Sequence, residues 1–182
     1  IKLEQALTVD VIDTIKTLDS SSSAISNNTT NTGSITICKV IVSTTGVIAT
    51  SSASLPAGTF SVSLAPFNNQ ANSFSTSTFT AQNFAPNKSV ILNGQNDAQC
   101  TTINNLTLDG DGYSYSQESI TGTTSTAWQT PKYNDQYNTT VTNLNDFLPF
   151  DVTNDNSDGQ IVLTHSDKHR TLLVLNTYVP QT

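Results

Sequence analysis

Hydrophobic and polar positions alternate in short runs along most of the chain, and clusters of Gly, Pro, Asn and Asp separate the runs. Each run is rich in β-branched or aromatic residues, and a period of two is typical of strands that bury one face. The runs are SITICKVIV, GTFSVSLA, SVILNG, TINNLTLDG, GYSYSQES, QIVLTH and TLLVLNTYV. This pattern predicts an all-β fold, a β-sandwich, over residues 34–182.

The N-terminal segment, residues 1–19, has its own pattern. Its strongest hydrophobic residues occupy odd positions, which predicts an extension strand with one apolar face. These residues are Ile1, Leu3, Leu7, Val9, Val11 and Ile15. Several of them are also spaced by four, which fits a helix, but the β-branched residues favour a strand. Residues 20–33 (SSSSAISNNTTNTG) are too polar to bury much apolar surface, and we interpret them as a linker.

An amphipathic strand tethered ahead of a globular domain is the arrangement that a polymerising subunit needs. Such a strand can complete an exposed sheet edge of a neighbouring copy through main-chain hydrogen bonds. The alternative is an ordinary first strand that packs on its own domain. The sequence leaves both open.

Three connections carry turn signals or weak patterning. The glycines of 109–112 (DGDG) reach positive φ without strain, so this segment is expected to be a hairpin turn. Residues 165–170 (HSDKHR) are expected to form a second hairpin turn between two apolar runs. Residues 122–158 are expected to form a long loop with a short strand or helical turn around 141–148.

The composition indicates an exported protein. Only 12% of residues are charged, and seven basic residues against 14 acidic ones give a net charge of -7. This balance repels nucleic acid and anionic lipid, and we exclude both as partners. No stretch approaches the ~18 apolar residues of a membrane span. Ile1 fits a matured secreted chain as well as a trimmed one, and we expect an extracellular or cell-surface location.

The cysteine and histidine residues indicate a crosslink more than a metal site. Cys38 and Cys100 are the only cysteines, and in an exported chain we expect a disulfide, with two buried thiols as the alternative. His165 and His169 have metal-ligand spacing for a helix, but their turn context argues against a site. The acidic run 151–158 resembles a calcium loop without its closing glutamate, and a solvated turn is favoured. We expect no cofactor.

Four segments, ITICKVIV, PAGTFSVSL, GDGYSYSQES and LLVLNTYV, resemble the Cna protein B-type or prealbumin-like domains of bacterial pilins and surface adhesins. The resemblance spans about residues 34–179 and implies a prealbumin-like or Ig-like sandwich. In that family a lysine on the first strand bonds to an asparagine on the last, promoted by a buried acid. The resemblance places the lysine at Lys39 and the asparagine at Asn176. The family spacing from Tyr113 reaches Gln117, so Glu118 is the candidate acid only if a bulge turns it inward.

Alternation within the first strand gives Lys39 an unusual environment. Lys39 shares a face with Ile35, Ile37 and Ile41, where an unpaired ammonium would be costly. Burial lowers the pKa of a lysine and makes its amine nucleophilic. On the other face, Cys38 stands beside two valines that need a cover. That cover is either the segment carrying Cys100 or a strand from another subunit.

Five asparagines stand in Asn-x-Ser/Thr frames and are candidate glycosylation sites: Asn27, Asn28, Asn87, Asn105 and Asn138. No nucleophile, base and acid are grouped as a hydrolase requires, so we do not expect an enzyme. The sequence predicts a subunit of an extracellular filament, a pilus or fimbria, with its own copies as partners. The alternative is an adhesin that binds a glycan or surface protein through aromatic residues of 122–158, Trp128 first among them.

Overall fold

The computed structural model describes residues 32–67, 75–91, 94–118, 120, 127–136, 143–144, 147–149 and 160–180. The N-terminal segment, the linker up to residue 31 and the acidic run 151–158 lie outside the described residues. The first strand, β1, spans Thr32–Ser43. Thr32 and Gly33, which the sequence analysis included in the linker, therefore belong to this strand.

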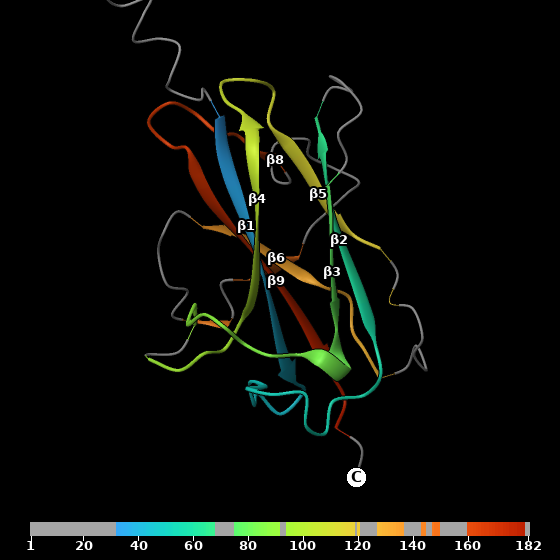
Figure 1. Cartoon of the computed structure of the whole chain (residues 1–182). Coiled ribbons are helices and arrows are strands. Elements are labelled where there is room, and N and C mark those ends of the chain that lie inside the picture. Colours follow the sequence, from blue (N-terminus) through green and yellow to red (C-terminus); the bar gives the residue numbers. More distant parts are fainter. Residues whose placement is uncertain are drawn as a thin grey trace, which may run out of the picture. The chain divides into compact units, whose positions relative to one another are not determined.

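The described strands form two sheets that pack face to face, so the protein is an all-β sandwich (Figure 1). One sheet has the order β4-β1-β9-β6-β7 and the other has the order β3-β2-β5-β8. The elements after β1 are β2 (Thr59–Pro66), β3 (Ser75–Thr80), η1 (Ala81–Asn83), β4 (Gln99–Thr107), β5 (Tyr113–Gln117), β6 (Lys132–Gln136), β7 (Leu148–Pro149), β8 (Gln160–Ile161) and β9 (His169–Tyr178).

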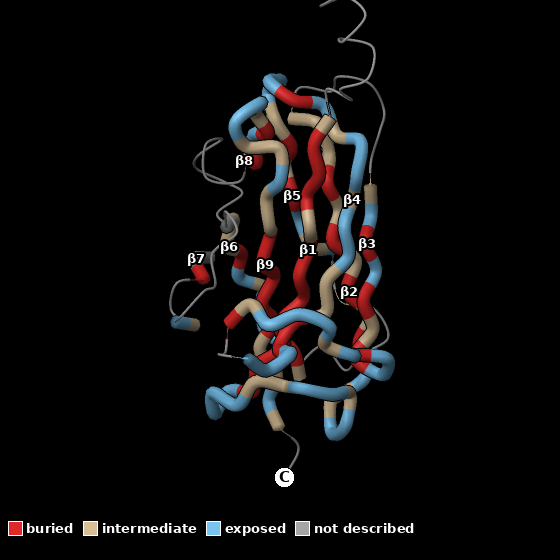
Figure 2. The backbone as a smooth tube through the Cα atoms, turned by 60° about the vertical axis from the view of Figure 1, so that its left-hand side comes forward, coloured by how far each residue is buried: buried red, intermediate tan, exposed pale blue. Residues whose placement is uncertain are grey.

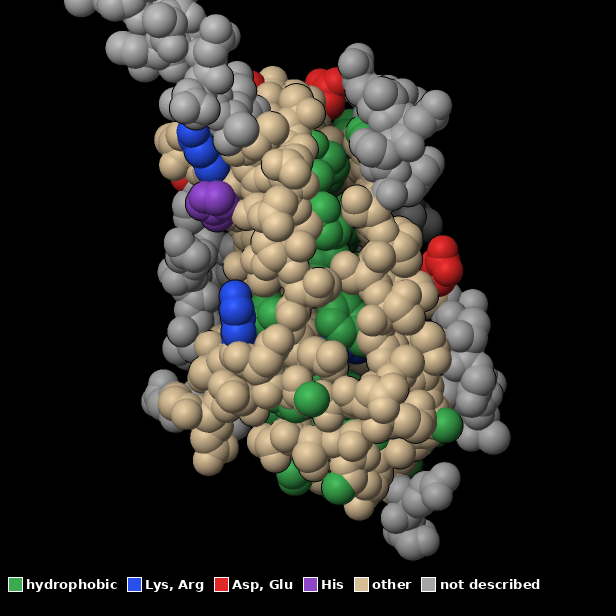
Figure 3. Space-filling model, viewed as in Figure 1, with side chains coloured by type: hydrophobic (Ala, Val, Ile, Leu, Met, Phe, Trp, Pro, Cys, Tyr) green, Lys and Arg blue, Asp and Glu red, His purple; other side chains and the backbone are tan. Residues whose placement is uncertain are grey.

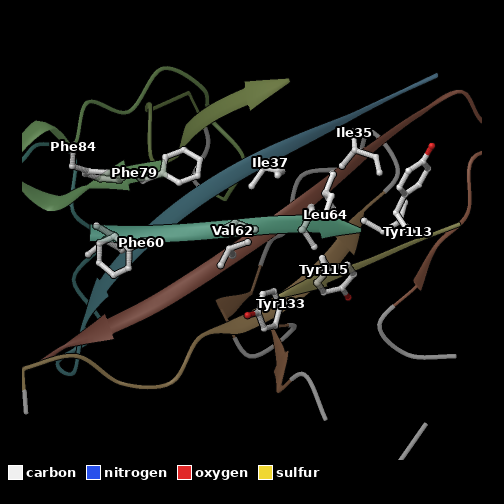
Figure 4. Packing of buried hydrophobic residues seen from close by; sticks show 14 of the residues in the cluster. Ile35, Ile37, Phe60, Val62, Leu64, Phe79, Phe84, Tyr113, Tyr115 and Tyr133 are labelled. Atoms are coloured by element: carbon white, nitrogen blue, oxygen red, sulfur yellow. The ribbon is translucent and has the colours of Figure 1, made fainter. Parts of the chain in front are cut away.

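The core between the sheets follows the predicted alternation. On β2, Phe60, Val62 and Leu64 are buried while the serines between them are only half-buried. These three side chains point toward the apolar face of β1, as Figure 4 shows. Burying each large apolar side chain stabilises the fold by about 1.5–3 kcal/mol. The period-two pattern thus fixes which face of each strand enters the core.

β1 differs from the other strands because both of its faces are buried (Figure 2). It lies between β4, to which it is antiparallel, and β9, to which it is parallel. Its second face joins a separate apolar cluster with the segment that precedes β4. The members of this cluster are Cys38, Val40, Val42, Ile91, Ala98, Phe147, Leu173 and Leu175.

The cover over the valines of β1 is therefore supplied by the chain itself, and the alternative of a strand from another subunit at this face is wrong. Val90 and Ile91 lie over the valines, and Phe147 packs beside them. The buried Asp97 carboxylate holds this segment by accepting the backbone N–H of Val90 at 2.7 Å and of Ile91 at 3.0 Å. The outer face of β1 is closed without a partner.

Both predicted hairpin turns are instead links between the two sheets. Residues 108–112 connect β4 of one sheet to β5 of the other, and residues 162–168 connect β8 to β9. Gly112 has φ +79°, and a Cβ there would lie 2.6 Å from the carbonyl oxygen of Ile161. Position 112 therefore requires glycine, as predicted. The reason is the passage of the chain from one sheet to the other, not a hairpin.

Strands with mainly polar sequences were not predicted. β3 (STSTFT) buries only Ser77 and Phe79, and in β6 (KYNDQ) Tyr133 is the buried residue. β6 lies inside 122–158, which was interpreted as a long loop. Conversely, SVILNG was expected to be a strand, but Ser89 to Ile91, which are described residues of this run, form a covering segment outside any strand. An isolated bridge joins the preceding residue, Lys88, to Ala98.

Candidate functional site

A lysine lies in the middle of the sandwich. Lys39 of β1 is fully buried, on the face that it shares with Ile35, Ile37 and Ile41. Its Nζ lies 4.3 Å from the centre of the Phe60 ring, which comes from the opposite sheet. The placement that alternation predicted is confirmed.

The register of β1 against β9 brings Asn176 to this lysine. Lys39 is opposite Val174 and Ile41 is opposite Asn176, so Lys39 and Asn176 are diagonal neighbours on one face. Asn176 is fully buried, and its Oδ1 accepts a hydrogen bond from Lys39 Nζ. Its Nδ2 donates to the carbonyl oxygen of Gln129 at 3.0 Å, which fixes the amide orientation.

Gln117 supplies the third polar group of the site. It ends β5 in the opposite sheet, and its Oε1 accepts a hydrogen bond from Lys39 Nζ at 2.9 Å. The backbone N–H of Gln117 donates to the Tyr133 hydroxyl at 2.7 Å. Burial raises the pKa of Tyr133, which keeps that hydroxyl protonated. The lysine thus joins β1, β9 and β5 across the core.

The site favours the neutral amine of Lys39 over the ammonium. Burial lowers the pKa of Lys39 well below the usual lysine range, because the ammonium loses its hydration there. A neutral amine has two N–H groups, and the carbonyl oxygens of Asn176 and Gln117 accept both. The neutral form is therefore buried with its donors satisfied, which removes the cost of an unpaired polar group.

The candidate acid does not join the site. Glu118 is exposed, and its backbone N–H donates to the carbonyl oxygen of Ser61. Gln117 occupies the place that the family spacing assigns to the acid, and a carboxamide does not release and regain a proton as a carboxyl group does. The nucleophile and the carbonyl are together, whereas the proton-transfer group is missing from that position.

Cys38 and Cys100 form the predicted disulfide. They are direct partners in the antiparallel pairing of β1 with β4. β1 is consequently tied to β4 by a covalent bond and to β9 by its ladder and the Lys39 contact. Cys38 faces away from Lys39, as alternation predicted, and the disulfide lies in the second apolar cluster of β1.

The remaining candidate residues are separate from this site. His165 pairs with Asp109 on the surface, and His169 shares a 2.8 Å hydrogen bond with Ser34. Across the described residues, no three His, Cys, Asp or Glu side chains gather to hold a metal ion. Within the same ranges, no helix has the length and apolar character to cross a membrane.

Of the five glycosylation frames, only two asparagines fall within the described residues. Asn105 is exposed at φ +61° in β4. Asn87 is exposed too, but its Nδ2 and Oδ1 pair with the backbone of Cys100 at 3.2 and 2.9 Å. The carboxamide of Asn87 therefore already has a structural role. Asn27, Asn28 and Asn138 lie outside the described residues.

Comparison of the chain with protein-family models, with curated proteins and with solved structures found no match. The fold and the Lys39 site thus carry the functional argument, and the resemblance to Cna protein B-type domains stays a prediction.

Proposed function

We propose that this chain is a structural subunit of an extracellular filament, a pilus or fimbria, and that its N-terminal strand is donated to a neighbouring subunit. The observation that carries the proposal is the pairing of the first and last described strands. β1 and β9 are parallel and paired over ten consecutive positions, from Ser34 with His169 to Ser43 with Tyr178.

This pairing suits a domain that transmits tension. The chain enters β1 at one end of the sandwich and leaves β9 at the other, as Figure 1 shows. Tension applied between the two termini therefore slides the two strands past each other. In that geometry the ladder hydrogen bonds share the load, whereas a hairpin pulled at its open end loses them one by one. Resistance to force depends on the unfolding rate, which such a clamp lowers.

β1 also makes the contacts that link it to three other strands. β1 is bonded to β4 by the Cys38–Cys100 disulfide, and Lys39 links it to Asn176 of β9 and to Gln117 of β5. A disulfide persists in oxidising compartments, which supports an extracellular location. The lysine and asparagine on the first and last strands also support a prealbumin-like domain of the Cna protein B type. A structural role of this kind needs neither a cofactor nor a catalytic centre.

The adhesin alternative loses its main support. Trp128, the first candidate for a surface contact, is buried, and so are Tyr133 and Phe147, the other aromatic residues of 122–158 that the structure describes. The Trp128 ring packs edge-on to Phe60 at 4.8 Å, and its Nε1 donates to the carbonyl oxygen of Ala57. These aromatic residues close the core, so we propose the filament role alone.

Assembly of the purified chain tests the proposal. The full chain, a chain lacking residues 1–18, and a chain with those residues scrambled would be compared by electron microscopy and sedimentation velocity under native, non-reducing conditions. We expect filaments from the full chain only, since the scrambled segment lacks the alternation. Filaments from the shortened chain would refute strand donation, and a full chain that stays monomeric would refute the filament role.

A further inference from the structure

β3 is an edge strand without the usual protection against pairing. Among the described strands it pairs with β2 alone, through six consecutive positions without a register shift. Its sequence, STSTFT, contains no charged residue and no proline. Natural edge strands commonly carry a charge, a proline or a bulge that blocks the addition of another strand. β3 carries none of these.

The edge strand of the other sheet, β4, is irregular by comparison. Its pairing with β1 shifts register between Gly33 and Ile35, and Asn105 at that point has φ +61°. A bulge of this kind bends and twists the edge, which makes it a poor template for a further strand. Of the two edges on this side of the sandwich, β3 is the one suited to accept a strand.

Hydrophobic side chains are visible along the seam between β4 and β3 in Figure 3. Ile103 and Leu106 of β4 pack on the core cluster but remain half-buried, and Phe79 of β3 belongs to the same cluster. Among the described strands, β4 and β3 belong to different sheets and no ladder pairs them. A strand added at β3 would cover this seam.

We propose that residues 7–11 of one copy add as a strand to the β3 edge of a second copy, with Leu7, Val9 and Val11 facing the seam. This inference rests on the proposed strand donation and names its receiving site. Residues 7–11 (LTVDV) have the cleanest alternation of the N-terminal segment, and they place Thr8 and Asp10 on the outer face. Five residues extend about 17 Å, which matches the six residues of β3.

The outer face of β3 fits the outer face of the added strand. Thr76 and Thr78 are exposed and point away from the core, so they would lie beside Thr8 of the incoming strand. Hydroxyl pairs across neighbouring strands are favourable, as in the bond between Ser63 and Thr76 at 3.1 Å. Donation from copy to copy is a heterologous contact that need not close, so it produces an open filament.

Cysteine trapping in the full chain tests the receiving site. Both native cysteines are in the disulfide, so a single substitution adds one free thiol. Copies with Thr8→Cys and one affinity tag would be mixed with copies carrying Thr78→Cys and a tag of different length, then oxidised mildly. The matched control replaces the second partner with Thr102→Cys, which is exposed on β4.

We expect disulfide-linked dimers that contain both tags from the Thr8 and Thr78 mixture, and at least tenfold fewer from the Thr102 mixture. If filaments form but the Thr102 mixture gives as many linked dimers as the Thr78 mixture, or if neither mixture gives any, the β3 site is wrong. The filament proposal is not affected by either of these results. A full chain that never associates would overturn the filament proposal itself. A double variant that links Thr8 to Thr78 within one monomer would show folding back onto the same copy and overturn donation between copies.

Discussion

Removal of the Cys38–Cys100 disulfide should lower the free energy of unfolding substantially. The two residues are separated by 62 positions, and closing a loop of that length stabilises a fold by about 4 kcal/mol in the chain-entropy description. Native disulfides of small secreted domains typically contribute about 2–5 kcal/mol. For a domain of this size, a loss near the middle of that range lowers the melting temperature by about 10 °C.

Urea denaturation of a Cys38→Ala, Cys100→Ala double variant measures this loss. Trp128 is the only tryptophan and is buried against Phe60, so its fluorescence reports the sandwich. The wild-type chain after reduction is the matched control, because it lacks the bond but keeps both sulfur atoms. Equal midpoints for reduced and oxidised wild type, within the equivalent of about 0.5 kcal/mol, would refute the argument that the bond braces β1.

Three further predictions concern the core and the β6–β9 pairing. After reduction, the wild-type chain should have its full sequence mass under denaturing conditions, whereas Gln117→Glu should be lighter than its sequence mass by one ammonia as the Lys39 amine replaces the amide nitrogen of Asn176. A Gln117→Glu variant at its full sequence mass would count against the missing-acid argument. Burial lowers the pKa of Lys39 in the folded chain, whereas the unfolded chain protonates this amine below about pH 10.4. The unfolded state therefore binds more protons, and the free energy of unfolding should rise from neutral pH toward pH 10, by at most about 1.4 kcal/mol per unit. A Lys39→Met variant with the same pH slope would contradict this. Arg170→Met should lower the free energy of unfolding by about 1–3 kcal/mol, because it leaves the Asp135 carboxylate unpaired. Burial already raises the pKa of Asp135, and the two hydrogen bonds from Arg170, of 2.5 and 3.1 Å, act against that rise. A melting temperature unchanged within about 1 °C would disprove this prediction.

The sequence predicted strands well where alternation combined with β-branched residues. In ITICKVIV both faces are apolar, and β1 is accordingly the strand that is buried on both sides. The same alternation predicted that Lys39 lies in the core and that Cys38 lies on the opposite face. It failed for β3 and β6, because each of them buries one or two side chains at or near a sheet edge and needs little hydrophobicity. Pairing with a neighbour, which a single segment does not encode, holds such strands.

Connections and the site required information that a local pattern lacks. Asp109 to Gly112 has turn residues for a hairpin, yet the strands that it joins lie in different sheets. Gln117 was identified only as the residue at the family spacing, and its contact with Lys39 depends on how the two sheets face each other. The anchoring of Asn176 by the carbonyl of Gln129 had no sequence signal, because a backbone group supplies it.

Single-molecule force measurement on the oxidised full chain tests the central claim most directly. Pulling between the two termini loads β1 and β9 in shear, whereas pulling between attachment points at Ser34 and His169, which are register partners at one end of the ladder, separates the strands one pair at a time. We predict a clearly higher unfolding force between the termini at equal loading rates. Equal forces in the two geometries would contradict a tension-bearing clamp between the first and last strands.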